Sequence, residues 1–85
     1  MDVLNTPPIV DVIIPAFNEE KSIAKVIGDI PALVRHVVVA NNNSTDRTAE
    51  VALAAGAKVV FEPQKGYGKA CLTAMDWIKQ QGVQP

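Results

Sequence analysis

Three groups of polar and glycine residues follow apolar runs in this sequence, and each has the chemistry to contribute to a nucleotide site. They lie at residues 15–20, 41–46 and 63–69. Amide and carboxylate oxygens can accept hydrogen bonds from the edge of a base, whereas lysine side chains and free N–H groups can face phosphates. In open α/β sheets such loops meet at the carboxyl ends of the strands, where nucleotides usually bind. We therefore expect one site built from all three groups.

Strands and helices that could position these groups can be recognised from the pattern of apolar residues. Runs rich in β-branched residues at 9–14, 37–40 and 58–61 predict strands, and Pro15 is expected to end the first of them. Apolar spacing predicts helices that begin near residue 19, after residue 46 and near residue 67, the last ending near residue 81. The predicted buried stripes are Ile23, Val26, Ile27 and Ile30 on the first helix, Ala49, Ala52 and Leu53 on the second, and Cys71, Ala74, Met75 and Ile78 on the third. Asn18 is a candidate N-cap for the first helix, and Asp46 for the second.

The alternation of strand and helix predicts a three-layer α/β fold of Rossmann-like topology, with a small parallel sheet in the order 3-2-1. The strands are continuously apolar, as expected where helices cover both faces of the sheet. Residues 1–8 are interpreted as an extended lead-in and residues 9–85 as the nucleotide-binding part. An edge strand leaves backbone groups unpaired, so a homodimer through the first strand is an assembly that this edge allows.

Composition excludes several other classes of function. The net charge is -1, so the chain lacks the basic field that a nucleic-acid partner requires. The single cysteine, Cys71, cannot form an intramolecular disulfide, which fits a reducing compartment. No apolar run approaches the roughly 20 residues that a transmembrane helix needs. We expect a cytoplasmic protein with no transmembrane segment and no metal ligands.

The three groups together resemble the motifs of family 2 glycosyltransferases, a GT-A group that includes dolichyl-phosphate mannose and glucose synthases. A first strand of that family ends in a pattern like Ile-Pro-Ala-Tyr-Asn-Glu-Glu, and residues 14–20 depart from it only at Phe17. The second typically ends like Val-Asp-Asp/Asn-Gly-Ser-Thr-Asp. Here residues 40–46 place Asn41 at the first acidic position and Asn43 at the glycine. The third group is also similar to bacterial members.

This resemblance implies a set of residues that border the nucleotide: Pro15, Ala16, Asn18, Glu19, Asn41, Asn42, Gly66, Gly68 and Lys69. In the family an acidic residue of the second group accepts a hydrogen bond from the ring N–H of uracil or guanine, and the amide oxygen of Asn41 or Asn42 could do the same. Structural alternatives stay open at this point. Asn18 could only cap a helix, Asn43 could only shape a turn, and the paired glycines could form a solvated turn.

The function implied by the resemblance is transfer of a sugar from a UDP- or GDP-sugar to an acceptor, with Mg²⁺ or Mn²⁺ on the diphosphate. The family's Asp-x-Asp metal motif and its catalytic base lie beyond the region that these residues match, so we expect no catalytic residue here and no turnover by the 85-residue chain alone. Two alternatives are a non-catalytic nucleotide-binding or self-associating module, and a sugar-1-phosphate nucleotidyltransferase-like domain. The second would need a glycine-rich loop with an Arg after the first strand, which this sequence lacks.

Overall fold

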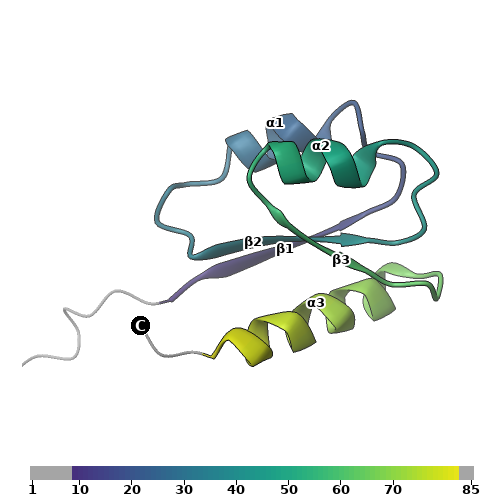
Figure 1. Cartoon of the computed structure of the whole chain (residues 1–85). Coiled ribbons are helices and arrows are strands. Elements are labelled where there is room, and N and C mark those ends of the chain that lie inside the picture. Colours follow the sequence, from purple (N-terminus) through teal and green to yellow (C-terminus); the bar gives the residue numbers. More distant parts are fainter. Residues whose placement is uncertain (1–8, 83–85) are drawn as a thin grey trace, which may run out of the picture.

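Strands and helices alternate along the chain in the computed structural model, which describes residues 9–82 (Figure 1). The strands are β1 (Asp11–Ala16), β2 (His36–Asn41) and β3 (Lys58–Phe61), and the helices are α1 (Ile23–Gly28), α2 (Thr48–Ala54) and α3 (Tyr67–Gln81). The strands are parallel, and β2 lies between the other two. The predicted α/β class and strand order 3-2-1 are therefore confirmed. The predicted lead-in at residues 1–8 lies outside the described residues.

The sheet lies between two helical layers, with α1 and α2 on one face and α3 on the other (Figure 1). On the first face Val39 belongs to a buried cluster with Ile23 and Ala52. On the second face Val38 is buried with Ala70 and Ala74. Consecutive side chains of a strand point to opposite faces, so β2 supplies both cores. This is the physical reason for its continuous apolar run.

Strand β1 continues through Pro15, so the prediction that this proline ends the strand was wrong. Pro15 is in register with Ala40 of β2. The carbonyls of Val10 and Ala16 accept hydrogen bonds from N–H groups that flank β2. Backbone groups alternate in direction along a strand, so those of Pro15 point to the open edge of the sheet. A proline there removes no hydrogen bond from the sheet.

The first two helices begin later than predicted. α1 begins at Ile23, and Asn18 does not cap it because its backbone is left-handed, with φ 54°. A turn precedes the helix instead, in which the N–H groups of Ser22 and Ile23 donate to the carbonyl of Glu19 at 3.0 and 2.9 Å. α2 begins at Thr48, two residues after the predicted cap.

Part of each predicted apolar stripe is exposed to solvent. The exposed fraction is 44% for Val26, 57% for Leu53 and 44% for Met75. The buried stripe of α3 instead begins with Ala70 and Ala74, so the face that packs on the sheet is rotated from the predicted one. Small side chains at these positions let the helix approach the sheet closely.

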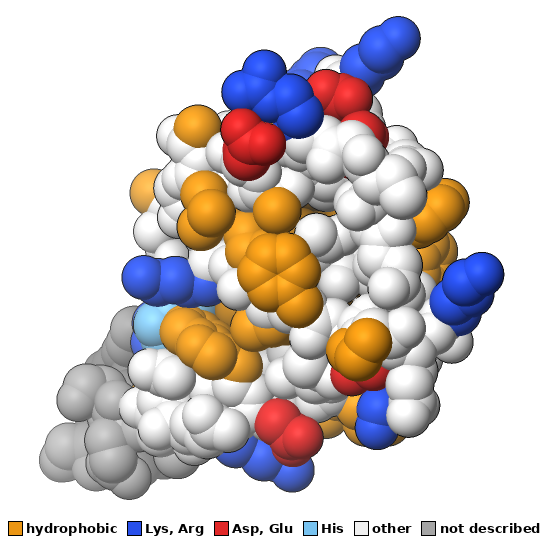
Figure 2. Space-filling model, turned by 45° about the vertical axis from the view of Figure 1, so that its right-hand side comes forward, with side chains coloured by type: hydrophobic (Ala, Val, Ile, Leu, Met, Phe, Trp, Pro, Cys, Tyr) orange, Lys and Arg blue, Asp and Glu red, His pale blue; other side chains and the backbone are white. Residues whose placement is uncertain are grey.

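Apolar side chains also gather on the surface. Figure 2 shows them across the middle of one face, with charged side chains mostly around its rim. Phe61, at the end of β3, is 64% exposed, and Phe17 and Tyr67 are also exposed. Within residues 9–82, none of the helices combines the length and the apolar character that crossing a membrane would require.

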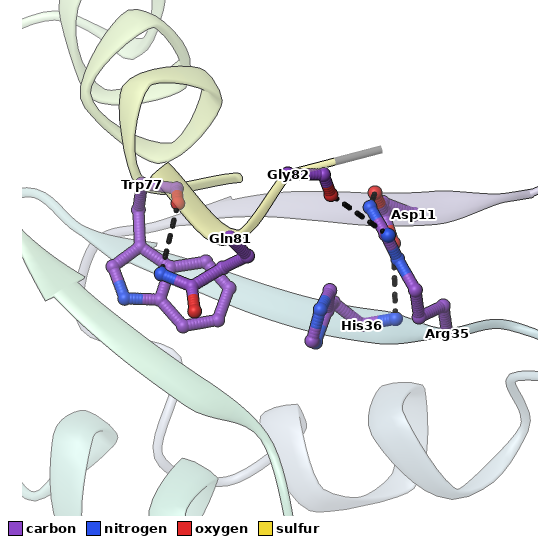
Figure 3. A network of polar contacts seen from close by, with 6 residues as sticks. All are labelled: Asp11, Arg35, His36, Trp77, Gln81 and Gly82. Atoms are coloured by element: carbon purple, nitrogen blue, oxygen red, sulfur yellow. Dashed lines mark hydrogen bonds and ion pairs between the residues drawn. The ribbon is translucent and has the colours of Figure 1, made fainter. Parts of the chain in front are cut away.

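Arg35 forms an ion pair with Asp11 at the amino-terminal edge of the sheet and a hydrogen bond with the residue that follows α3 (Figure 3). Arg35 donates from Nη2 and Nε to the two carboxylate oxygens of Asp11, at 2.7 and 3.1 Å, and from Nη1 to the carbonyl of Gly82 at 2.9 Å. The hydrogen bonds from Arg35 hold the pKa of Asp11 below its ordinary value. Beside this pair, the rings of His36 and Trp77 meet edge to face at 5.2 Å.

Candidate functional site

Three loops follow the strands at the carboxyl edge of the sheet (Figure 1). The first loop is residues 17–22, the second is 42–47 and the third is 62–66. Because the strands are parallel, the loops lie side by side although they are far apart in the sequence. Each is bonded to a neighbour by side-chain hydrogen bonds, and these bonds determine which polar groups are left for a ligand.

The first and second loops are joined through Asn18. Its N–H donates to the hydroxyl oxygen of Ser44 at 2.9 Å, and its side-chain oxygen accepts from the N–H of Thr45 at 2.8 Å. Asparagine is among the few residues that adopt a left-handed backbone readily, which explains the residue type at φ 54°. Asn18 therefore organises the loops, and one lone pair of its amide oxygen is already used.

A second connection runs through Thr48, which is fully buried. Its hydroxyl oxygen accepts a hydrogen bond from the N–H of Glu19 at 2.8 Å and donates to Asp46. Asp46 also accepts from the N–H of Thr48 at 2.9 Å and of Glu20 at 3.3 Å. Although burial acts to raise it, these hydrogen bonds hold the pKa of Asp46 below its ordinary value. The carboxylate thus satisfies backbone donors at the start of α2 and in the first loop.

The second and third loops are joined by the amides of Asn42 and Asn43. The Nδ2 group of Asn42 donates to the carbonyls of Glu62 and Gln64 at 3.0 and 2.7 Å, and its Oδ1 accepts from the N–H of Gly66 at 2.9 Å. Asn43 donates to the carbonyl of Pro63 at 2.9 Å. The backbone of Asn43 is left-handed, with φ 66°, so it also shapes the turn.

The side chain of Glu62 connects the third loop to α3. Glu62 is buried, and its carboxylate accepts hydrogen bonds from the hydroxyl of Thr73 at 2.5 Å and from the N–H of Gln64 at 2.8 Å. The hydrogen bond from Thr73 is the largest of the contributions that hold the pKa of Glu62 below its ordinary value. The hydrogen bond from Gln64 and the charge of Lys69 lower it further. A charged carboxylate therefore fixes the loop onto α3.

Two cavities open between these loops. The first, of about 380 Å³, is lined by Phe17, Asn42, Asn43, Lys65, Gly66 and Tyr67. The second, of about 390 Å³, is lined by Asn41, Asn43, Ser44, Phe61, Glu62 and Pro63. Asn43 borders both, so the cavities adjoin. The first is the more apolar of the two and combines aromatic rings with a lysine.

The structure brings three of the predicted residues to a cavity wall. Asn42 and Gly66 line the first cavity, and Asn41 lines the second. The remaining predicted residues line neither cavity: Pro15 and Ala16 at the end of β1, Asn18 and Glu19 in the first loop, and Gly68 and Lys69 in the first turn of α3.

The predicted set of site residues omitted four residues that line the first cavity: Phe17, Asn43, Lys65 and Tyr67. Each is a sequence neighbour of a predicted residue, and two are aromatic. For Phe17 the signal in the sequence was an aromatic side chain in a polar loop just after a strand, since such a side chain has no core to enter.

The described residues do not fit a divalent-metal site. Between residues 9 and 82, no group of three His, Cys, Asp or Glu side chains is arranged to hold a metal ion. Two of the carboxylates at the loops, those of Asp46 and Glu62, already accept several hydrogen bonds each from the protein. Their oxygens hold the loops together.

Comparison with other protein sequences identifies relatives among sugar transferases. An uncharacterized glycosyltransferase of Mycobacterium tuberculosis is 54% identical over 61 residues, which cover 72% of this chain and 28% of the relative. A dolichyl-phosphate hexose transferase of Haloferax volcanii is 38% identical over 66 residues, which cover 75% of this chain and 29% of the relative. This chain therefore spans less than a third of the length of either relative.

The fold also matches part of a sugar transferase of known structure. A structure of glucosyl-3-phosphoglycerate synthase from Mycobacterium tuberculosis, solved with Mn²⁺, UDP and glucosyl-3-phosphoglycerate, superimposes with a TM-score of 0.71 at 31% identity. The match covers 80% of this chain and 29% of the synthase. Residues 11–83 match the model of the family described as glycosyl transferase family 2. Since the match extends over most of its length, the chain belongs to glycosyl transferase family 2.

Proposed function

We propose that this chain is the nucleotide-binding part of a glycosyltransferase that takes a sugar from a nucleoside-diphosphate sugar, UDP- or GDP-linked, and transfers it to an acceptor. The observation that carries the proposal is the first cavity, which has two aromatic side chains, a lysine and two asparagines at the loop edge of a family 2 fold. The family membership argues against the nucleotidyltransferase alternative.

The base is proposed to lie against the aromatic rings of Phe17 and Tyr67. These side chains are 47% and 52% exposed, although both line a cavity that a planar ring could fill. Stacking of a base on an aromatic side chain is typically worth about 1–3 kcal/mol and tolerates different bases. It therefore supports nucleotide binding without specifying uracil or guanine.

The diphosphate is proposed to lie near Lys65 and the start of α3. Lys65 lines the cavity, and α3 begins at Tyr67 without any hydrogen bond from a capping side chain. Free N–H groups and the positive end of the helix dipole favour an anion at that position. Gly68 and Lys69 lie in the first turn of α3. Gly68 is proposed to offer its backbone N–H to the diphosphate, and Lys69 its positive charge.

The edge of the base is proposed to be read by Asn41. Its Oδ1 accepts a hydrogen bond from the N–H of Ser44 at 3.1 Å, which leaves a second lone pair on that oxygen. Asn41 is buried at the wall of the second cavity, next to the first. Pro15, Ala16, Asn18 and Glu19 are proposed to shape the backbone beneath the nucleotide.

The divalent ion and the catalytic base are proposed to come from the part of the family domain that this chain does not cover. The mycobacterial synthase was solved with Mn²⁺ and UDP, and this chain covers 29% of it. A bound Mg²⁺ or Mn²⁺ supplies positive charge that stabilises the leaving diphosphate. We accordingly expect no sugar transfer by the 85-residue chain alone.

Titration of the isotope-labelled chain with UDP and GDP, followed by amide chemical shifts, tests the proposal. We expect shifts centred on Lys65, Gly66 and Tyr67. The Kd should be about 1 mM, which corresponds to a binding free energy of about -4 kcal/mol. Added Mn²⁺ or Mg²⁺ should change that Kd by less than about twofold. Phe17→Ala should weaken binding, whereas Leu72→Ala, at an exposed position outside both cavities, should not. Shifts confined to other surfaces, or none with either nucleotide at about 10 mM, would refute the proposal.

A further inference from the structure

We propose that Asn42 is a positioning residue, which holds the third loop in its nucleotide-binding shape, and that it does not itself read the base. The inference deepens the proposed function and rests on it. It concerns a choice that the sequence left open, because Asn41 and Asn42 are adjacent and chemically identical.

The hydrogen bonds of Asn42 are almost fully committed within the protein. Both of its amide hydrogens have a backbone carbonyl acceptor, at 3.0 Å in Glu62 and at 2.7 Å in Gln64. Its Oδ1 accepts from the N–H of Gly66 at 2.9 Å. The side chain is 5% exposed. One lone pair of Oδ1 remains, so Asn42 has no free N–H donor to offer a bound base.

The geometry of these bonds matches an amide and no other side chain of this size. An amide has two donors and an acceptor in one plane, whereas a carboxylate only accepts. The partners lie 20, 22 and 24 residues away, all within one loop, so a single rigid group fixes that loop at three points. The N–H of Asn42 also donates to the carbonyl of Ala16 at 2.9 Å. Asn42 thus links the ends of all three strands.

The loop that Asn42 holds provides part of the first cavity. Lys65 and Gly66 are in the loop, and Tyr67 follows it directly. Gly66 has φ 123°, a conformation that other residues rarely adopt, so the turn depends on both the glycine and its partner amide. Asn43 gives a weaker second link through Pro63, at 2.9 Å from an exposed position.

Gln80 offers a matched control outside the site. It is exposed near the end of α3 and lines neither cavity. Gln80→Glu and Asn42→Asp both replace an amide by a carboxylate, but only the second removes donors that hold the third loop. Asn42→Ser, which keeps one hydroxyl donor, is a milder second variant.

The first measurement is hydrogen exchange of side-chain amides in the unmodified chain. The Nδ2 protons of Asn42 should exchange at least about tenfold more slowly than those of the exposed Gln80, because both are bonded. The second is the shift that a fixed, sub-saturating concentration of UDP induces at Lys65 and Tyr67. We expect about a tenfold loss in Asn42→Asp, an intermediate loss in Asn42→Ser and no loss in Gln80→Glu.

These readouts separate the two proposals. Absence of UDP-induced shifts in the unmodified chain would overturn the proposed function and this inference with it. Normal shifts in the unmodified chain that persist undiminished in Asn42→Asp would overturn the positioning role alone. Should Asn42→Asp fail to fold, undiminished shifts in Asn42→Ser would overturn the positioning role. Side-chain protons of Asn42 that exchange as fast as those of Gln80 would also overturn it.

Discussion

The side-chain oxygen of Asn18 lies 2.8 Å from the backbone nitrogen of Thr45 and accepts its hydrogen bond. This contact spans 27 residues of sequence and fixes the first loop against the second. The N–H of Asn18 returns a bond to Ser44 at 2.9 Å, so the two loops hold each other reciprocally. The loop edge of this domain is consequently a bonded unit, and changes in one loop should be felt in its neighbour.

Replacement of Asn18 by Ala should destabilise the fold. The variant leaves the N–H of Thr45 without its acceptor and places a less tolerant residue at φ 54°. We expect a loss of about 1–3 kcal/mol in the free energy of unfolding, measured by urea denaturation followed by circular dichroism. Asn18→Asp keeps the acceptor and tolerates the backbone angle, so it should lose less than half as much. Equal losses in both variants would show that the contact with Thr45 is not what matters.

Thr48→Val tests the buried hydroxyl between the first loop and α2. The change preserves the shape of the side chain but leaves the N–H of Glu19 without its acceptor and removes a donor to Asp46. We expect a loss of about 1–3 kcal/mol in thermal unfolding, whereas Thr48→Ser, which keeps the hydroxyl, should lose only about 1 kcal/mol for its methyl group. A valine variant as stable as the serine variant would contradict this account.

The stability of the chain should fall at acidic pH. The pKa values of Asp11, Asp46 and Glu62 are lowered in the folded state from ordinary values of 3.8, 3.8 and 4.5. A lowered pKa contributes stability that is present above the unfolded value and is lost as the pH falls through the folded value. The urea midpoint should therefore be constant from about pH 7 to 5 and fall below about pH 4.5. Asp11→Asn should reduce this acid dependence. A midpoint unchanged between pH 7 and pH 3 would rule out the assigned pKa directions.

The 85-residue chain should self-associate through the open edge of β1. Within the described residues β1 pairs only with β2, and the backbone groups of Ile13 face outward. Val12→Lys places a charge on this edge strand at a half-buried position, so it should shift the chain towards monomer in light scattering. Phe61→Lys places the same charge at the opposite edge, on β3, and should leave the association unchanged. Association that is abolished by Phe61→Lys alone would assign the contact to β3.

Sequence patterns predicted the elements whose signals are local. The bounds of β3 and α3 agree with the prediction, because β-branched residues mark the strand and glycines flank the helix. The start of α1 could not be predicted in this way. Asparagine is a residue type that often caps helices. The side chain of Asn18 instead accepts a hydrogen bond from a residue 27 positions away, and its backbone adopts a left-handed turn.

The roles of Pro15 and Asn42 depended on tertiary structure for the same reason. Whether a proline ends a strand depends on which edge of the sheet is open, and that is a property of the topology. Adjacent asparagines look alike in sequence, yet only the fold determines that one of them faces the carbonyls of the third loop. The sequence thus predicted which loops form the site, whereas the role of each residue within those loops required the structure.

The ion pair at the opposite end of the sheet has a practical consequence. Arg35 binds both Asp11 and Gly82, so the two ends of the described chain lie close together (Figure 3). The cavities lie at the other edge of the sheet, between the loops that follow the strands. A tether attached beyond either end would pull on this anchor and leave the loop edge unobstructed. Immobilised on a sensor surface through its ends, the domain would present its cavities to the solution.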